Sequence, residues 1–578
     1  MKIGRNIFQT SCLIVATGLF VLAQAQKAGM TRLSTDAGSL FTLSPNWKTA
    51  QRVLMHPEKA DFVKLEAGNG ILVGTAGSTA QTTLGAGDLV LKLEFMLSPN
   101  SEAVIQLPDK QFISIKDSWQ NTKLDALTTG SVGNVAPLQN ANKAPGLWQT
   151  LRVQLRKPRA GTLAQIEQLL LNGVLVQENT RLPAISSAPD DVLGLEVKKG
   201  TVAFRKIDYQ LLNDVKPLSI SQLSYQLYKG GMESSGQFKS ENLLKKDTTS
   251  VLTQEWGVGN NNYTVVYEGK MNVEQSGLYL FQFAYMNELM VEIDDKTVLP
   301  LQWSEFSQKL VSKSVSLTQG QHSFRLRYHK FWRPAAMGVF VSIQGVRPYA
   351  LHLASSLPDP EPMPTIAVDA NQRPEMVRSF ILMDGETKKR THCLSVGSAS
   401  GLHYTLDLNR GSLLQFWKGS FADVTEMWFE RGEPQLLKPL GLTLTTKGQT
   451  DVAPLADNNA AWPDSTLEIT YKGYRLDAAG NPAVLYRYSN AELTDAILPT
   501  ANGLTRTLTL TGAVSAPLYV KLATGSRISQ IEKGLHEIND QNYFVRTDPK
   551  ANVLIRSQNN QQELLLPVGS SVQYTLVW

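Results

Sequence analysis

Short runs of alternating apolar and polar residues recur along the whole chain. Leu89–Phe95 (LVLKLEF), Ser323–Tyr328 (SFRLRY) and Val572–Trp578 (VQYTLVW) are examples. Alternation of this kind is typical of half-buried strands with one wet face. Turn signals such as Asn172-Gly173 and Thr318–Gly320 separate the runs at hairpin distances, and long helical periodicities are scarce. The sequence therefore predicts an all-β protein built of sandwiches or jelly rolls.

The first 25 residues have the three parts of a secretory signal peptide. Lys2 and Arg5 give a positive start, Cys12–Leu22 is apolar, and Ala23–Ala25 supplies a small-x-small cleavage signature. The apolar part is too short to span a membrane. We therefore predict cleavage after Ala25 and an exported protein that is periplasmic, secreted or held at the cell surface. No later stretch is long and apolar enough to predict a transmembrane segment.

Proline-rich and turn-rich stretches divide the chain. Residues 356–374 carry five prolines, a composition typical of an extended, semi-rigid linker. A softer boundary lies near residues 213–219. A length of 578 residues also favours several domains over one. After the signal peptide at 1–25, the sequence predicts three β-sandwich or jelly-roll domains in series, at 30–213, 217–353 and 375–578.

Charge and motif content exclude several classes of protein. Lys and Arg number 56 and Asp and Glu 51, without long basic runs, so no nucleic-acid partner is expected. The two cysteines, Cys12 and Cys393, exclude a disulfide framework and a cysteine zinc site. Cys393 is predicted to be a buried free thiol. No HExxH, CxxCH, Walker or GxGxxG motif is present, which leaves covalent haem and nucleotide binding unsupported.

Residues 38–212 carry a series of motifs in a characteristic order. They are Leu93–Pro99 (LEFMLSP), Asp117-Ser118, Pro145–Thr150 (PGLWQT), Leu171–Val174 (LNGV) and Val202–Ile207 (VAFRKI). In order and spacing this part resembles the 3-keto-disaccharide hydrolase family, a concanavalin-like jelly roll. The resemblance implies action on glycosides that are oxidised at the sugar 3-position.

Glu94 and Asp117 are the candidate catalytic residues of this part. Alternation places Glu94 on the polar face of its strand, where a carboxylate can act as a base or accept hydrogen bonds from a sugar. The alternative is a solvated residue paired with Lys92 or a cross-strand cation, and for Asp117 it is a turn residue. The family usually carries a carboxylate where this chain has Phe112, so the motif is degenerate there. Trp148 is a candidate sugar-stacking residue, or else a core tryptophan.

The next part carries motifs of a second family. They are Leu223–Gly230 (LSYQLYKG), Val266–Gly269 (VYEG), Ser276–Phe281 (SGLYLF), Val291–Asp294 (VEID) and Leu317–His322 (LTQGQH). This part resembles the protective-antigen-type lectin module, a β-sandwich. The resemblance implies a glycan-binding accessory domain or a spacer.

Calcium holds the sugar in glycan-binding members of that family, through an Asp-Asp pair. Here the matching stretch is Tyr285–Glu288, and its Met286 cannot ligate Ca²⁺, which needs oxygen ligands. The pair Asp294-Asp295 belongs to the following hairpin, where a turn role is expected. We therefore predict no metal and no cofactor. Trp332, within a cluster of aromatic and basic residues, is a candidate sugar platform or an interdomain packing residue.

The third part carries the motifs His392–Gly397 (HCLSVG), Gly401–Asp407 (GLHYTLD), Leu413–Gly419 (LLQFWKG) and Met427–Gly432 (MWFERG). With them it resembles a region attached to large exported bacterial proteins of the sorbosone-dehydrogenase and cytochrome type, which implies context rather than mechanism. Four side chains suit a carbohydrate cleft, with indole faces beside charged donors and acceptors. The alternative is a structural Arg–carboxylate network under tryptophan packing. These candidate substrate-binding residues are Trp417, Asp423, Trp428 and Arg431.

Two hypotheses about function follow. The first is an exported carbohydrate-active protein whose jelly roll has hydrolase- or lyase-like action on 3-keto-glycosides, with accessory glycan-binding modules. The second is a non-catalytic glycan-binding or scaffold protein of the cell envelope, with envelope proteins as further partners. Both take carbohydrate as the ligand.

Overall fold

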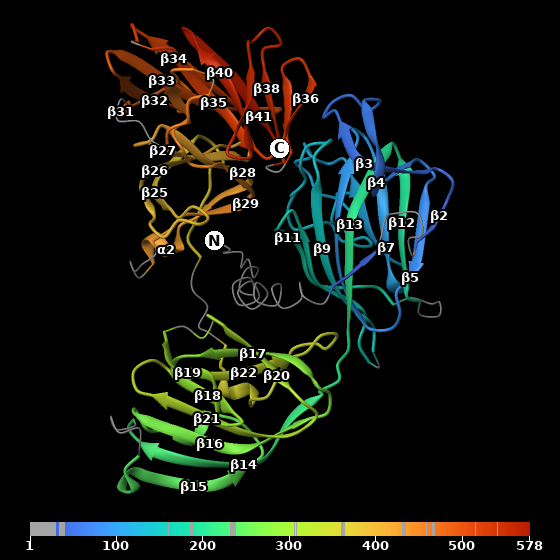
Figure 1. Ribbon diagram of the computed structural model, residues 1–578, viewed down its shortest axis with the longest axis vertical. Helices are drawn as coiled ribbons and strands as arrows, with labels where there is room; N and C mark the ends of the chain where they lie inside the picture. Colours follow the sequence, from blue (N-terminus) through green and yellow to red (C-terminus); the bar gives the residue numbers. More distant parts are fainter. Residues whose placement is uncertain are drawn as a thin grey trace, which may run out of the picture. The chain divides into compact units, whose positions relative to one another are not determined.

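The computed structural model describes residues 30–33, 41–159, 161–184, 190–231, 238–305, 307, 309–359, 365–429, 435–457, 459–464, 469–514, 516–539 and 542–578. Within this part nearly every element is a strand (Figure 1), so the predicted all-β class is confirmed. The predicted signal peptide lies outside the described residues, as does the middle of the proline-rich linker. In the described part, no helix has the length and apolar character needed to cross a membrane.

Contacts divide the chain into two compact units. One unit contains residues 209–363 with the short stretch 87–89, and the other contains residues 32–86, 90–208 and 364–578. The second unit therefore combines most of the jelly roll with the C-terminal part of the chain.

The jelly roll has an eight-stranded and a five-stranded antiparallel sheet. The larger sheet runs in the order β11 (Val174–Arg181), β10 (Gln165–Leu171), β9 (Gln149–Arg156), β6 (Asp88–Leu97), β13 (Thr201–Leu212), β4 (Val63–Thr75), β3 (Trp47–Met55), with β1 (Thr31–Leu33) on β13. The smaller sheet runs β2 (Thr42–Leu43), β5 (Thr79–Thr83), β12 (Val192–Lys199), β7 (Glu102–Leu107), β8 (Gln111–Lys116).

Alternation along the strands builds the jelly-roll core. Leu91, Leu93 and Phe95 of β6 are fully buried, as are Ile105 of β7 and Ile113 of β8. Each sheet thus buries one face in the manner of a sandwich. The opposite face of β6 carries Lys92 and Glu94, as its alternation predicts.

The C-terminal part forms three sheets. The first sheet contains β24 (Ala367–Val368), β28 (Ser412–Asp423), β27 (Leu402–Asp407), β26 (Arg390–Gly397), β25 (Glu375–Ile381) and β29 (Lys438–Thr445). The second sheet contains β30 (Val452–Pro454), β35 (Leu518–Gly525), β40 (Gln561–Val568) and β39 (Leu554–Gln558). The third contains β31 (Ile469–Leu476), β32 (Pro482–Tyr488), β33 (Ala491–Thr500), β34 (Gly503–Thr511), β41 (Ser571–Val577), β38 (Tyr543–Thr547), β37 (Leu535–Ile538) and β36 (Ile528–Glu532). A short helix, α2 (Thr425–Trp428), follows β28.

One hydrophobic core runs from the C-terminal sheets into the jelly roll. Ala144 and Leu147, from the loop before β9, belong to the same buried cluster as Phe544 and Trp578. Strand β36 accordingly lies beside the β3–β4 hairpin (Figure 1), and Arg52 of β3 donates a hydrogen bond to Ser529 of β36. The jelly roll and the C-terminal sheets therefore share an interface within one unit.

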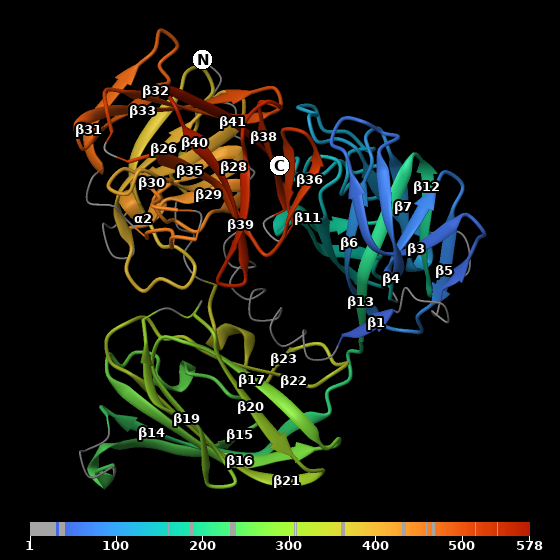
Figure 2. The ribbon, with the colours of Figure 1, turned by 45° about the horizontal axis from the view of Figure 1, so that its top comes forward.

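The other unit is a sandwich of two sheets (Figure 2). The larger sheet contains β15 (Leu243–Thr249), β14 (Leu218–Lys229), β16 (Tyr263–Val273), β21 (Gly320–Lys330), β18 (Asn287–Ile293) and β19 (Lys296–Ser304). The smaller sheet contains β20 (Val311–Leu317), β17 (Gly277–Tyr285), β22 (Met337–Ser342) and β23 (Tyr349–Ala350). Their inner faces meet in one core of Tyr, Phe and aliphatic side chains, which includes Tyr267, Phe281 and Tyr328.

Candidate functional site

Glu94 is held by two cations from the neighbouring strand β13. Arg205 Nε donates to Glu94 Oε2 at 2.6 Å, and Lys206 Nζ donates to Glu94 Oε1 at 2.9 Å. Two consecutive residues reach the same carboxylate because Lys206 has a φ of 50°, which breaks the strand alternation as a bulge does. Burial opposes ionisation of Glu94, but the charges and hydrogen bonds of Arg205 and Lys206 outweigh it and lower its pKa. Glu94 is therefore a carboxylate at neutral pH.

Trp148 lies directly under Arg205. The guanidinium carbon of Arg205 is 3.8 Å from the centroid of the Trp148 ring, a cation–π contact. The loop before Trp148 approaches the neighbouring strand closely at Gly146, where φ is 81° and an added Cβ would stand 2.5 Å from the Met55 carbonyl oxygen. Trp148 itself is 7% exposed. Arg205 thus connects a carboxylate on one side to an aromatic face on the other.

A pocket of about 430 Å³ opens beside Arg205 and Trp148, and we call it the arginine pocket. Strands β3, β4 and β13 supply one wall, and the segments that flank β36 and β37 supply the other. It is lined by Gln51, Arg52, Val53, Glu66, Ile71, Trp148, Arg205, Ser526, Arg527 and Asn539.

Four of the ten residues in this lining are charged. Arg52 and Glu66 are cross-strand partners in the β3–β4 register, and Arg52 Nη1 donates to Glu66 Oε1 at 2.7 Å. Arg527 Nη2 lies 3.9 Å from the same Glu66 oxygen. Three guanidinium groups therefore surround the pocket, with one carboxylate in its wall.

A second carboxylate, Glu537 of β37, is buried close to this lining. Burial raises the pKa of Glu537 to about 7. The charges of Arg52, Arg205 and Arg527 and a hydrogen bond with Asn539 act in the opposite direction and lower it, but burial outweighs them. Glu537 is 2% exposed, and its Oε2 atom has no hydrogen-bond partner among the described residues. A carboxyl group with a pKa near neutrality can hold or release a proton under physiological conditions.

Lys143 is a further buried titratable group near Glu94. Burial lowers the pKa of its ammonium group to about 8, although the charge of Glu94 acts in the opposite direction. It precedes Trp148 in the same loop. Sequence reasoning missed Lys143, Arg52, Arg527 and Glu537; Arg205 stood in a family motif without an assigned role.

Asp117 is not brought to this site. Its Oδ2 atom accepts a hydrogen bond from the Asn100 backbone N–H at 2.9 Å, in the turn that follows β6. Glu94 lies three residues before the end of β6, roughly 10 Å along the strand. Phe112 belongs to β8 of the other sheet and is 42% exposed. A carboxylate at position 112 would therefore lie on a different sheet from Glu94.

The candidate residues of the C-terminal part are dispersed. Trp417 is fully buried and stacks on Phe421, so its indole has no face open to a sugar. Asp423 Oδ1 accepts a hydrogen bond from the Thr425 backbone N–H at 2.8 Å and holds the turn that opens α2. Trp428 is 55% exposed. Arg431 lies outside the described residues.

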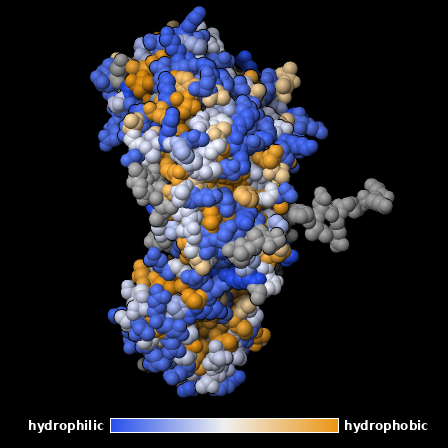
Figure 3. Space-filling view, turned by 90° about the vertical axis from the view of Figure 1, so that its right-hand side faces the viewer, coloured by the Kyte–Doolittle hydropathy of each residue, from blue (hydrophilic) through white to orange (hydrophobic). Residues whose placement is uncertain are grey.

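Trp332, in the other unit, projects from a loop after β21 and is 66% exposed. Asn287 holds this loop, because its Oδ1 atom accepts hydrogen bonds from the backbone N–H groups of Trp332 and Arg333, both at 3.0 Å. The Arg333 guanidinium carbon is 4.8 Å from the Trp332 ring centroid. The amide of Asn287 thus fixes the backbone that carries this exposed indole. On the face of the molecule drawn in Figure 3, apolar residues stand in patches among hydrophilic ones.

The pair Asp294-Asp295 forms a turn. Both residues have positive φ, and Asp294 Oδ2 lies 2.6 Å from His322 Nδ1. Across the described ranges, no group of three or more His, Cys, Asp or Glu side chains is placed to hold a metal ion.

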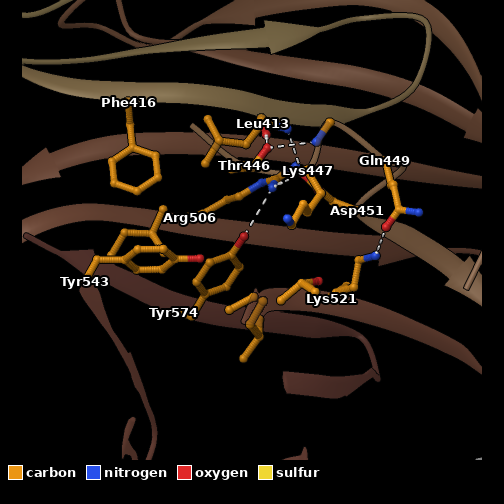
Figure 4. A pocket seen from close by; sticks show the side chains of 15 residues that line it. Leu413, Phe416, Thr446, Lys447, Gln449, Asp451, Arg506, Lys521, Tyr543 and Tyr574 are labelled. Atoms are coloured by element: carbon orange, nitrogen blue, oxygen red, sulfur yellow. Dashed lines mark hydrogen bonds and ion pairs between the residues drawn. The ribbon is translucent and has the colours of Figure 1, made fainter. Parts of the chain in front are cut away.

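The C-terminal sheets enclose a second, much smaller cavity around Arg506 (Figure 4). Arg506 donates to both oxygens of Asp495, at 2.9 and 2.7 Å, and to Asp451 at 2.6 Å. The Tyr574 hydroxyl accepts from the same guanidinium at 3.1 Å. The cavity holds about 40 Å³, room for a water molecule or two and not for a sugar. This network is structural.

Comparisons with known proteins confirm the family resemblances of the first two parts of the chain. Residues 36–210 match the 3-keto-alpha-glucoside-1,2-lyase-like domain, and residues 221–332 match the PA14 domain. The PA14 domain is a lectin-like β-sandwich, and the remainder of the chain is β-rich. Together these matches support a carbohydrate-active protein.

Solved structures give weaker likenesses. Two crystal structures from Parabacteroides distasonis, named as candidate glycosyl hydrolases, are 17% and 11% identical. They cover 32% and 33% of this chain and 99% and 97% of their own, with TM-scores of 0.24 and 0.23. A β-glucosidase from Kluyveromyces marxianus is 16% identical over 22% of this chain and 16% of its own, with a TM-score of 0.18. These likenesses say nothing of function. No curated protein matches the chain.

Proposed function

We propose that the protein is an exported enzyme that cleaves 3-keto-glycosides on the polar face of the jelly-roll sheet. The observation that carries the proposal is the cluster of Glu94, Arg205 and Trp148 beside an open pocket, within the residues that match the lyase-like domain. Such a cluster offers a base beside a cation, and the buried Trp148 ring supports that cation.

The chemistry needs one base and one cation. A ketone at C3 of the sugar acidifies the proton on C2. A base takes that proton, the C2–H electrons form a C1=C2 double bond, and the C1–O bond to the leaving group breaks. The leaving oxygen takes up a proton, which gives an alcohol and a conjugated enone. Addition of water to the enone then completes a net hydrolysis.

The side chains suit these roles. Glu94 is our candidate base, because it is ionised at neutral pH. Arg205 and Lys206, which hold the Glu94 carboxylate, are our candidates to stabilise negative charge that develops on the ketone oxygen. Lys143, whose pKa is lowered to about 8, is the candidate donor of a proton to the leaving oxygen. Asp117 enters this proposal only as a residue that shapes the turn after β6.

Turnover of 3-keto-trehalose and 3-keto-glucosides by the mature protein tests the proposal. We expect Glu94→Gln to lower kcat/KM by about 100-fold or more, the contribution of a positioned general base. Glu492→Gln, at an exposed position of β33, is the matched control and should leave turnover unchanged. Full turnover by the Glu94→Gln protein would remove Glu94 from the mechanism.

A non-catalytic glycan-binding or scaffold protein of the cell envelope is the second candidate. Asp117 in a turn, Phe112 on the other sheet and the exposed Trp332 favour it. In that case Trp332, Trp428 and the arginine pocket are the proposed sugar contacts. A glycan array with wild-type protein and Trp332→Ala separates the two candidates when it is combined with the turnover assay. Binding without turnover selects the scaffold.

Export is proposed from the N-terminal sequence. Lectin-like and glycosyl hydrolase-like domains are typical of extracellular proteins. The N-terminus of protein recovered from the periplasm or medium should be Gln26. We also propose that the chain has three domains, at residues 30–213, 217–353 and 375–578. Envelope proteins are its proposed further partners.

A further inference from the structure

The arginine pocket has more positive than negative charge. Arg52, Arg205 and Arg527 face it, and Glu66 is the carboxylate of its lining. Glu94 binds Arg205 but shares its charge with Lys206, and it is not part of the pocket lining. When Glu537 is protonated, at least one positive charge is therefore in excess.

Arg527 and Arg205 are placed to meet a ligand. The Arg527 side chain is 57% exposed, and its distance of 3.9 Å from Glu66 is too long for a hydrogen bond. Arg205 lies on the Trp148 ring, with 28% of its side chain exposed. The Arg506 network is different, because there one buried guanidinium is bound by two carboxylates and closed to solvent. The arginine pocket is thus open to solvent at Arg527 and in part at Arg205.

We propose that the arginine pocket binds a carboxylate-bearing sugar, a uronate unit of a glycan, and that Glu537 sets the affinity. This inference rests on the proposed carbohydrate function and names its ligand class. Guanidinium groups bind carboxylates with two parallel hydrogen bonds. Gln51 and Asn539 add amide donors and acceptors for sugar hydroxyls, and Ile71 and Val53 give an apolar floor. A pocket of about 430 Å³ has room for one or two sugar rings.

Glu537 controls the charge that the ligand meets. It lies on β37, paired with Ser529 of β36, and the charges of Arg52, Arg205 and Arg527 act on it. Asn539 is its hydrogen-bond partner. A neutral Glu537 leaves the net charge around the pocket one unit more positive, which attracts an anion. An ionised Glu537 takes up one of those charges, so an anionic ligand binds more weakly as the pH rises through about 7.

Calorimetric titration with a glucuronate-containing disaccharide and its glucose counterpart tests the inference. At about pH 5.5 we expect the uronate to bind at least tenfold more tightly, and at about pH 8.5 we expect its affinity to fall by about tenfold. Glu537→Gln should keep the tight binding at both pH values. Arg527→Ala, at an exposed position, should reduce uronate binding by about tenfold, whereas Arg475→Ala of β31, which does not line the pocket, should not.

Equal affinity for the two disaccharides would overturn the inference, and so would tighter binding of sulfated sugars than of uronates. A pH response that persists in a folded Glu537→Gln protein would remove Glu537 from it. These measurements do not depend on turnover. Uronate binding without cleavage of 3-keto-glycosides would contradict the proposed enzyme alone, and cleavage without uronate binding would contradict this inference alone.

Discussion

Asn542 and the backbone of Trp148 exchange two hydrogen bonds across the interface between the C-terminal sheets and the jelly roll. The Trp148 N–H donates to Asn542 Oδ1 at 3.0 Å, and Asn542 Nδ2 donates to the Trp148 carbonyl oxygen. Trp148 also lies under Arg205, so the same contact that joins the two parts fixes the wall of the arginine pocket.

Replacement of Asn542 should therefore loosen the interface. We expect Asn542→Ala to lower the free energy of unfolding by about 1–3 kcal/mol, because it leaves buried backbone groups without partners. Chemical denaturation followed by tryptophan fluorescence measures the change. Lys472→Ala, at an exposed position of β31, is the control and should change stability by no more than about 0.5 kcal/mol. Equal stability of the two variants would contradict the role of Asn542.

The Arg506 network should be a larger source of stability. Arg506→Met removes the guanidinium that pairs with Asp495 and Asp451, and it leaves two buried carboxylates without their cation. We expect a loss of about 3–5 kcal/mol. Arg475→Met should lie within about 0.5 kcal/mol of wild type. A small loss for Arg506→Met would show that the carboxylates find other partners or take up protons at little cost.

Glu537 predicts a pH dependence of stability. Burial, opposed by Arg52, raises its pKa in the folded protein from 4.5 to about 7. A carboxyl group with a raised pKa contributes stability that is fully present below the pKa of the unfolded chain and is lost as the pH rises through the folded value. Between about pH 4.5 and 7 the wild type should therefore lose on the order of 3 kcal/mol from this group.

The Glu537→Gln variant isolates that contribution. Between about pH 4.5 and 7, the free energy of unfolding of this variant should fall less steeply with pH than that of the wild type. Denaturant titrations across this range measure the difference. Glu492→Gln should keep the wild-type slope. If Glu537→Gln and wild type have parallel profiles, the buried carboxyl does not titrate near neutrality.

Much of the fold could be predicted from the sequence, because strand alternation is a local signal. The run at Leu89–Phe95 correctly indicates which residues of β6 enter the core and that Glu94 faces away from it. The burial pattern of the C-terminal part is harder to predict from its sequence. In β28 residues 412–417 are all buried, so alternation gives no sign that Trp417 is enclosed.

The site was predictable only in part. The sequence places Glu94 on a polar face and leaves a cross-strand cation open as its partner, and Arg205 is that cation. The bulge at Lys206, which brings a second cation, has no local signal in a β-strand pattern. Arg527 and Glu537 are more than 300 residues from Arg205 in sequence, and only the packing of β36 and β37 on the jelly roll brings them near it.

Cys393 is a buried free thiol, as the sequence predicts, and its reactivity can be tested chemically. The thiol is free and buried, and its Sγ atom lies 3.5 Å from the Arg390 carbonyl oxygen. Burial and the charge of Asp407 raise its pKa to about 12. Because the thiolate is the reactive form, native protein should not react with a disulfide reagent at about pH 8.

Unfolding should expose this thiol and restore its reactivity. Protein that begins at Gln26 should titrate one thiol per chain in denaturant and none before it, measured by the absorbance of released thionitrobenzoate. A chain that keeps Cys12 should titrate two, so the same assay reports removal of the N-terminal segment. Prompt reaction of the native protein would mean that β26 opens readily, because the thiol is fully buried in the folded protein.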